Sequence, residues 1–163
     1  MILYIVRHAW AGEHDEKRYP NDDLRPLTAD GKKRFAKMLD RLSGAKIRPT
    51  WIATSPLVRC RQTADILAEH LAKTPEITEL VALRPDSDLG EVLAWAGRRK
   101  DDEQIAWVCH APAVTDLAAA LIGDGSASIR FAKGAIAAIR FEGPLERNAG
   151  ELAWLANAGM LGV

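Results

Sequence analysis

Cysteine is scarce in this 163-residue sequence, and neither sign of charge is in excess. The two cysteines, Cys60 and Cys109, match no metal-binding spacing and no disulfide framework, which suits a reducing compartment. Lysine and arginine number 22, as do aspartate and glutamate, so no long-range field favours nucleic acid or an anionic membrane. We therefore expect no nucleic-acid or membrane partner, and any anion must be recognised by local side chains.

Long apolar runs are also missing. The apolar run at residues 2–6 lacks a basic leader and is followed at once by charge, which argues against a signal peptide or a membrane-spanning helix. Together with the unpaired cysteines, this predicts a cytoplasmic protein. The length suits one domain with a full core, and no repeat, linker or low-complexity tract divides residues 1–163.

The cysteines do not fit the pattern of a cysteine-dependent phosphatase. Such enzymes carry an arginine at a fixed distance after the nucleophile, and the corresponding residues here are Ile66 and Thr115. Free cysteine is among the most buried residue types, so both cysteines are expected in or near the core.

Apolar residues recur at helical spacing in four segments, each of which follows a strand-like run or its loop. Thr28 is expected to cap the first helix, and Gly44 and Gly123 stand where the first and fourth are expected to stop. The periodic positions are Phe35, Met38, Leu39 and Leu42; Ala64, Leu67, Ala68 and Leu71; Leu89, Val92, Leu93 and Ala96; and Val114, Leu117, Ala118 and Leu121.

Four strand-like runs alternate with these helices, among them residues 2–6, 51–54 and 105–109. Two further strands, at residues 134–141 and 151–156, are expected to close the chain because turn-prone residues separate them. The alternation predicts an α/β protein, a three-layer α/β/α sandwich with a mostly parallel sheet.

Three of the strand-like runs lead into residues suited to binding a phosphoryl group. His8 and His110 each follow an apolar run almost directly, and Arg59 lies within about one helical turn of residues 51–54. The carboxyl ends of parallel strands form the ligand crevice of such a sheet, so these side chains and Arg7 are expected to meet there. Any one of these side chains alone would more often be a hydrogen-bonded structural residue than a functional one. Their occurrence together at the strand ends favours a phosphoryl-binding site.

Phosphoryl transfer requires positioning and neutralisation of charge on the equatorial oxygens, which arginine forks match bidentately. Arg7 and Arg59 would form this clamp. A neutral imidazole is a competent nucleophile, and neighbouring guanidiniums disfavour its protonation, so His8 is the candidate nucleophile. His110 would hydrogen-bond the transferred group.

Four ordered strings together resemble the histidine phosphatase superfamily, which has the phosphoglycerate mutase-like fold. They are Arg7-His8-Ala9, Arg25-Pro26-Leu27-Thr28 with Gly31, residues 55–64 (SPLVRCRQTA), and residues 108–112 (VCHAP). The Arg-Pro-Leu-Thr string and the short chain resemble the SixA-type phosphohistidine phosphatase branch.

The resemblance implies that His8 is the phosphorylated nucleophile, that Arg7 and Arg59 bind phosphate, and that His110 completes the pocket. It also implies that Arg25 reaches the site from its loop, that no metal or cofactor is needed, and that no cap is inserted.

The sequence departs from the family pattern at two points. The usual glycine of the Arg-His-Gly string is Ala9. Many relatives carry a proton-donating carboxylate after the third strand, where this chain offers only Glu79, out of the expected register. Imidazole leaves more readily than an alkoxide, so a missing acid favours a phosphoramidate substrate.

Other residues leave alternatives open. His14 and His70 could join His8 and His110 in a metal site, but their spacing fits no compact ligand motif, so no metal is predicted.

Trp10 either forms a wall of the substrate pocket or only packs against the protein interior. Residues 11–26 form either a rim over the crevice or an ordinary solvated loop. The tryptophans expected in the core are Trp51, Trp95, Trp107 and Trp154.

The sequence thus predicts a phosphatase that removes the phosphoryl group from phosphohistidine on a protein, such as a histidine phosphotransfer domain, and releases inorganic phosphate. A phosphatase of a small phosphomonoester or phosphoanhydride is the alternative within the same class. A non-catalytic phosphate-binding regulatory module is the alternative outside it.

Overall fold

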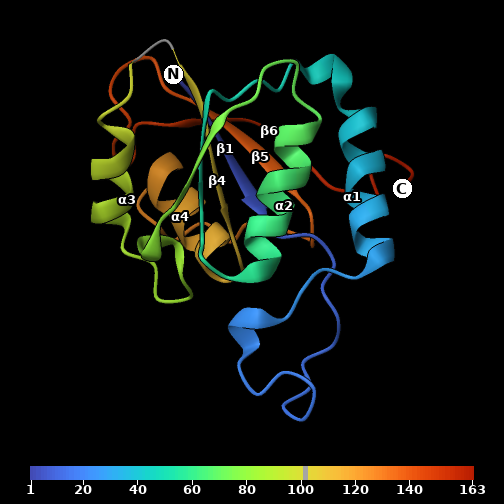
Figure 1. Cartoon of the computed structure of the whole chain (residues 1–163). Coiled ribbons are helices and arrows are strands. Elements are labelled where there is room, and N and C mark those ends of the chain that lie inside the picture. The colour runs from blue at the N-terminus through green and yellow to red at the C-terminus, as the bar shows by residue number, and fades with distance from the viewer. Residues whose placement is uncertain (101–102) are drawn as a thin grey trace.

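Six strands form one mixed sheet in the computed structural model, which describes residues 1–100 and 103–163 (Figure 1). The strand order is β3-β2-β4-β1-β5-β6; β1 to β4 run parallel, β5 is antiparallel to β1, and β6 is antiparallel to β5. This arrangement confirms the predicted fold class. The strands are β1 (Ile2–Arg7), β2 (Trp51–Thr54), β3 (Glu76–Glu79), β4 (Gln104–Cys109), β5 (Ile136–Arg140) and β6 (Glu151–Ala156).

Helices cover both faces of the sheet, α1 and α2 on one and α3 and α4 on the other (Figure 1). In β1, Leu3 and Ile5 face α3 and α4, while Tyr4 and Val6 face α1 and α2, as expected for a strand buried on both sides. The helices are α1 (Ala29–Arg41), α2 (Val58–Glu69), α3 (Leu89–Ala96) and α4 (Ala113–Ile122), with short 3-10 turns η1 (Asp22–Leu24), η2 (Ser43–Ala45) and η3 (Val81–Leu83).

Within the two described ranges, none of the helices combines the length and the apolar character needed to span a bilayer.

Two of the three predicted helix boundaries are confirmed. The Thr28 hydroxyl accepts a hydrogen bond from the amide of Gly31 at the start of α1, and Gly123 caps the end of α4. The prediction for Gly44 is wrong, because α1 already ends at Arg41 and the chain tightens into η2. The left-handed residue after this turn is Lys46, with φ of 53°.

Most of the residues expected in the core are fully buried. Trp107 and both cysteines have no exposed surface, and Trp95 is 7% exposed. Trp51 and Trp154 are only partly buried and pack against the core from its edge. The prediction that they lie within the core is therefore only partly confirmed.

The carboxyl ends of β1, β2 and β4 lie at one edge of the sheet, where residues 11–26 extend as a long loop (Figure 1). An antiparallel bridge pairs Ala11 with Leu27 at the base of this loop. The Leu27 amide also donates to Oε1 of Gln62 on α2, at 2.8 Å. The loop is therefore fixed at its base beside the start of α2.

Replacing Gly31 by alanine is expected to destabilise the protein. A Cβ at this position would lie 2.2 Å from the carbonyl oxygen and 2.9 Å from the Cβ of Trp10, so backbone must shift. Overpacking of this kind costs about 1–3 kcal/mol, which urea unfolding would measure. The matched control is Gly44→Ala, because a Cβ at Gly44 meets nothing within 4 Å. Equal stability of the two variants would contradict the close approach.

Candidate active site

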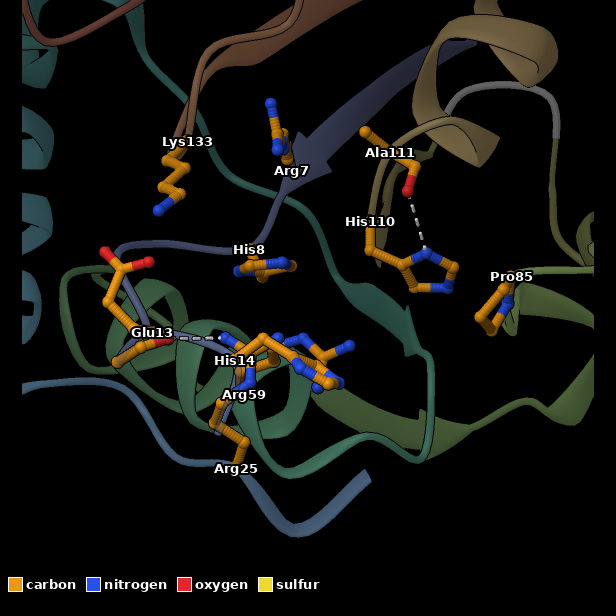
Figure 2. Close-up of a pocket in the computed structure, with 11 residues that line it drawn as sticks. Arg7, His8, Glu13, His14, Arg25, Arg59, Pro85, His110, Ala111 and Lys133 are labelled. Atoms are coloured by element: carbon orange, nitrogen blue, oxygen red, sulfur yellow. Dashed lines mark hydrogen bonds between the residues drawn. The ribbon is translucent and has the colours of Figure 1, made fainter. Parts of the chain in front are cut away.

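A cavity of about 340 Å³ opens at the carboxyl edge of the parallel strands (Figure 2). Five residues singled out from the sequence line it: Arg7, His8, Arg25, Arg59 and His110. Six further residues complete the wall: Gly12, Glu13, His14, Pro85, Ala111 and Lys133. The structure thus brings together the predicted histidines and arginines from three strand ends and the loop of residues 11–26.

His8 follows β1 directly and is held in a single tautomer. Its amide donates to the carbonyl oxygen of Cys109 at 2.8 Å, which fixes its backbone beside β4. Its Nδ1 lies 2.7 Å from the carbonyl oxygen of Ala9. A carbonyl oxygen only accepts, so Nδ1 carries the proton and Nε2 keeps its lone pair.

Burial lowers the pKa of His8 to about 3, despite the hydrogen bond to Ala9, and the charges of Arg59 and Arg7 act in the same direction. The imidazole is therefore neutral at physiological pH, with its lone pair on Nε2. This is the form in which an imidazole attacks an electrophile.

Arg7 and Arg59 are anchored in the same way. Nη1 of Arg7 donates to the carbonyl oxygen of Phe131 at 2.7 Å, and Nη1 of Arg59 donates to that of Asp22 at 2.8 Å. In both residues Nε is buried without an acceptor among the residues described. Buried unpaired donors are costly, so an anion bound in the cavity that both residues line would supply the missing acceptors.

Arg25 lines the same cavity, but its guanidinium is already bound to the loop. Nε and Nη2 donate to the two carboxylate oxygens of Asp22, at 2.7 and 3.3 Å, and Nη1 donates to the carbonyl oxygen of Gly12 at 2.7 Å. Each nitrogen therefore has an acceptor, in contrast to the buried Nε of Arg7 and Arg59, which have none among the described residues. Its position agrees with the expectation that Arg25 reaches the site, while its contacts brace the loop.

His110 follows β4 and contacts carbonyl oxygens through both ring nitrogens. Nε2 lies 3.2 Å from the oxygen of Leu83 and Nδ1 lies 3.5 Å from that of Ala111. Burial lowers the pKa of His110, and the charge of Arg59 lowers it further, so the free site favours a neutral ring with one N–H. A phosphoryl anion would add negative charge and favour the protonated ring, in which both nitrogens donate.

Trp10 is the one predicted binding residue outside the cavity wall. Its ring packs on Gly134, where a Cβ would lie 3.1 Å from Cζ3 of the indole, and the Arg34 guanidinium stacks 4.2 Å from the ring centre. The Gly134 amide in turn donates to the carbonyl oxygen of His8 at 3.0 Å. Of the two interpretations of Trp10, the structure favours packing, behind the backbone of His8.

A buried hydroxyl couples the segment after His8 to the helix that carries Arg59. Oγ1 of Thr63 accepts from the amide of Ala9 at 3.0 Å and donates to the carbonyl oxygen of Arg59 at 2.7 Å. Thr63 belongs to the string at residues 55–64 that supported the family resemblance, although the sequence did not reveal its role.

Glu13 and His14 line the cavity from the loop of residues 11–26, which agrees with the interpretation of this loop as a rim. Lys133, from the irregular segment between α4 and β5, carried no sequence signal, and neither did Asp22, which contacts Arg59 without lining the cavity. Periodic patterns are informative only within helices and strands, so they place neither of these two residues at the site.

Among the carboxylates, Glu79 lies outside the cavity, as expected from the sequence, whereas Glu13 lines it. Glu79 ends β3 and pairs with Arg61 at 3.4 Å, away from the cavity wall. Arg61 also pairs with Asp65 at 2.9 Å, so it faces away from the site, unlike Arg59. Glu13 is the one carboxylate among the described residues of the wall, and it is exposed at the mouth.

His70, one of the four histidines of the metal alternative, caps the C-terminus of α2 and lies 3.7 Å from Asp40. It is not among the residues that line the cavity. Within residues 1–100 and 103–163, no three His, Cys, Asp or Glu side chains gather in a group that could hold a metal ion.

Comparisons with known proteins agree with the motifs. A family model described as the histidine phosphatase superfamily (branch 1) matches residues 3–92. An uncharacterized protein of Picosynechococcus sp. is 37% identical over 124 residues, which cover 74% of this chain and 73% of that protein. The phosphohistidine phosphatase SixA of Escherichia coli is 27% identical over 144 residues, which cover 87% of this chain and 86% of that protein.

The solved structure of the protein histidine phosphatase SixA complexed with tungstate is similar over the whole chain. Its TM-score is 0.84 at 26% identity, and the alignment covers 99% of both chains. Together these matches confirm the resemblance inferred from the four strings.

In an NMR titration, we expect His8 to remain neutral and protonated on Nδ1 well below the usual histidine range. Its folded-state pKa of about 3 lies below the ordinary value of 6.5, so the unfolded chain binds more protons between these two values. The contribution of His8 to stability is therefore complete above about pH 6.5 and is lost as the pH falls toward about 3.

Urea unfolding between pH 7 and pH 4 tests the same shift, because His8→Asn should make stability less dependent on pH over this interval. A His8 resonance that titrates near its ordinary value would refute the buried, neutral imidazole.

Proposed function

Because the chain belongs to the histidine phosphatase superfamily (branch 1) and is therefore a phosphatase, we propose that it removes the phosphoryl group from phosphohistidine on a protein. The reaction proceeds through a phosphorylated His8 and needs no metal ion. A histidine phosphotransfer domain has the required chemistry as a substrate, because it presents a phosphorylated imidazole on a folded surface.

The observation that carries this proposal is the tautomer of His8. With Nδ1 held on the carbonyl oxygen of Ala9 and the pKa lowered to about 3, the lone pair of Nε2 is available at physiological pH. The buried Nε groups of Arg7 and Arg59, which lack acceptors among the described residues, line the same cavity. A nucleophile beside two unsatisfied guanidiniums suits phosphoryl transfer, which depends on positioning and charge neutralisation.

The reaction has two steps. In the first, Nε2 of His8 forms a bond to phosphorus while the P–N bond of the substrate breaks, and the departing imidazole nitrogen takes up a proton from solvent water. In the second, water attacks the phosphorus of phospho-His8, inorganic phosphate is released, and the electron pair returns to Nε2. Splitting the hydrolysis in this way replaces one difficult step with two easier ones.

Arg7 and Arg59 neutralise the equatorial oxygens in both steps. His110 acts with them as a hydrogen-bond donor. Before substrate binds, a neutral His110 ring has one N–H, which is enough for the contact between Nε2 and the carbonyl oxygen of Leu83. The negative charge of the bound phosphoryl group favours a second proton on the ring, which adds a second donor.

Two observations support phosphohistidine as the substrate. The phosphohistidine phosphatase SixA of Escherichia coli, 27% identical to this chain, is named for that substrate. In addition, Glu79 is paired with Arg61 away from the cavity, so it does not protonate a leaving group there. An imidazole needs less assistance in leaving than an alkoxide does.

The second candidate is a small phosphomonoester or phosphoanhydride. Glu13 favours it, because this carboxylate is part of the cavity wall and an alkoxide leaving group requires an acid.

His8→Ala is expected to abolish turnover because it removes the nucleophile, while the protein stays folded because the main-chain hydrogen bond from the His8 amide to Cys109 does not need the side chain. Wild-type protein incubated with radiolabelled substrate should carry acid-labile, alkali-stable label, and the variant should carry none. The matched control is His70→Ala, which removes an imidazole at the end of α2, outside the cavity. Label or turnover that survives in His8→Ala would assign the nucleophile to another residue.

The leaving group distinguishes the two candidate functions. We expect hydrolysis of phosphohistidine protein, phosphoramidate and activated aryl phosphates, and little hydrolysis of phosphoserine or alkyl phosphates, in assays with and without EDTA. Glu13→Gln and Glu79→Gln should leave P–N hydrolysis nearly unchanged. A loss of about a hundredfold in either variant, the size of a general acid contribution, would identify a proton donor and favour the phosphomonoester reaction.

A further inference from the structure

Asp22 occupies a central position in the loop of residues 11–26, although it does not line the cavity. Its carboxylate lies 3.1 Å from Nη2 of Arg59, and its carbonyl oxygen accepts from Nη1 of the same residue at 2.8 Å. The carboxylate also accepts two hydrogen bonds from Arg25. One residue therefore binds both terminal nitrogens of Arg59 and ties them to the loop.

These contacts leave the Nε of the Arg59 guanidinium without a partner among the described residues. Nη1 and Nη2 are occupied by Asp22, whereas Nε is buried and has no acceptor among the residues described. A guanidinium is planar, so fixing its two Nη atoms fixes the direction of its Nε–H bond. Asp22 stays ionised at physiological pH, because its hydrogen bond with Arg25 and the charge of Arg59 hold the pKa of its carboxyl group below the usual value.

The neighbouring Asp23 reaches the opposite side of the site. Its carboxylate pairs with Arg84 at 2.8 Å. Arg84 directly follows Leu83, whose carbonyl oxygen lies 3.2 Å from Nε2 of His110. The ion pair thus holds the end of η3 at the position where its backbone meets the imidazole.

We propose that Asp22 and Asp23 form a clasp that positions the phosphoryl-binding groups, Asp22 through Arg59 and Asp23 through the backbone that meets His110. This inference rests on the proposed function, because it assigns these aspartates a task in phosphoryl binding. Both are positioning residues. Asp22 contacts the wall residue Arg59 directly, whereas Asp23 contacts Arg84, whose neighbour Leu83 meets the wall residue His110. The loop of residues 11–26 then serves to align the site as well as to form its rim.

A competing role for Asp22 makes the opposite prediction. If Asp22 only repels the anion and competes for Arg59, its removal should tighten the binding of orthophosphate or tungstate and leave kcat unchanged. If Asp22 positions Arg59, its removal should weaken anion binding and lower kcat.

A double-mutant cycle measures the coupling. With an activated aryl phosphate, Asp22→Ala should lower kcat about tenfold to a hundredfold, as expected for a misaligned binding group. In the Arg59→Ala background the same change should have less than about a twofold effect, because the residue that it positions is gone. Asp22→Asn should recover part of kcat, since the amide oxygen still accepts from Arg59.

Glu16→Gln is the matched control. It removes one negative charge from the same loop, and Glu16 is exposed and has no side-chain hydrogen bond or ion pair with the described residues. Its kcat should equal that of the wild type. A similar loss in Glu16→Gln, or an equal effect of Asp22→Ala in both backgrounds, would overturn the assignment of Asp22.

Asp23 is tested in the same way against His110. Asp23→Ala and His110→Ala should be coupled, while Asp23→Ala and Arg59→Ala should combine additively. If the effects of Asp23→Ala and His110→Ala are additive, Asp23 does not position His110 and is not part of the clasp.

Calorimetric titration with tungstate separates this inference from the proposed function. Asp22→Ala should bind tungstate at least about tenfold more weakly than the wild type, whether or not any phosphohistidine substrate is turned over. A wild-type protein that binds tungstate but hydrolyses no P–N compound would refute the substrate proposal alone. Unchanged or tighter tungstate binding by Asp22→Ala would refute the clasp alone.

Discussion

Two guanidinium groups whose buried Nε atoms have no acceptor among the described residues impose the main constraint on this site. In both Arg7 and Arg59, one terminal nitrogen donates a hydrogen bond to a main-chain carbonyl oxygen. The Nε of each is buried and has no acceptor among the described residues. Such an arrangement is costly in the free protein and becomes favourable when an anion arrives. Their charges also help to keep His8 unprotonated, so the groups that attract the phosphoryl anion also help to keep its acceptor nucleophilic.

The sheet order explains why these groups meet. The strands β2, β4 and β1 are neighbours and run parallel, so Arg59, His110 and His8, which come after them in the sequence, emerge at the same edge. Arg7 pairs in register with Cys109, which places the two histidine-bearing junctions side by side. Arg59 lies one strand further along, and Thr63 links the main chain of its helix to that of Ala9.

The sequence was most informative where regular structure carries the function. A buried strand that ends at a histidine can be recognised from apolar residues alone, and parallel topology then places such ends together. Arg59 was accessible for the same reason, because it lies in the first turn of a helix after a strand. Asp22 and Lys133 were not, since no periodic pattern relates an irregular segment to a particular edge of the sheet.

Trp10 shows a further limit, because its neighbour Gly134 is distant in the sequence and only the folded chain brings it against the indole. Gly44 is not the helix stop because α1 ends at Arg41 and Gly44 lies within the 3-10 turn that follows.

The position of β4 has a consequence for how the protein becomes active. This strand lies between β1 and β2, although it is synthesised after both, and its pairing with β1 joins residues as far apart as Ile2 and Gln104. Contacts of such long range form late, because the intervening chain must be ordered first. Until β4 inserts, His8 lacks the carbonyl oxygen of Cys109 that holds its amide, and His110 is absent from the edge. A chain synthesised only as far as α2 therefore contains His8 and Arg59 but not His110, and phosphatase activity would mark the moment at which the centre of the sheet closes.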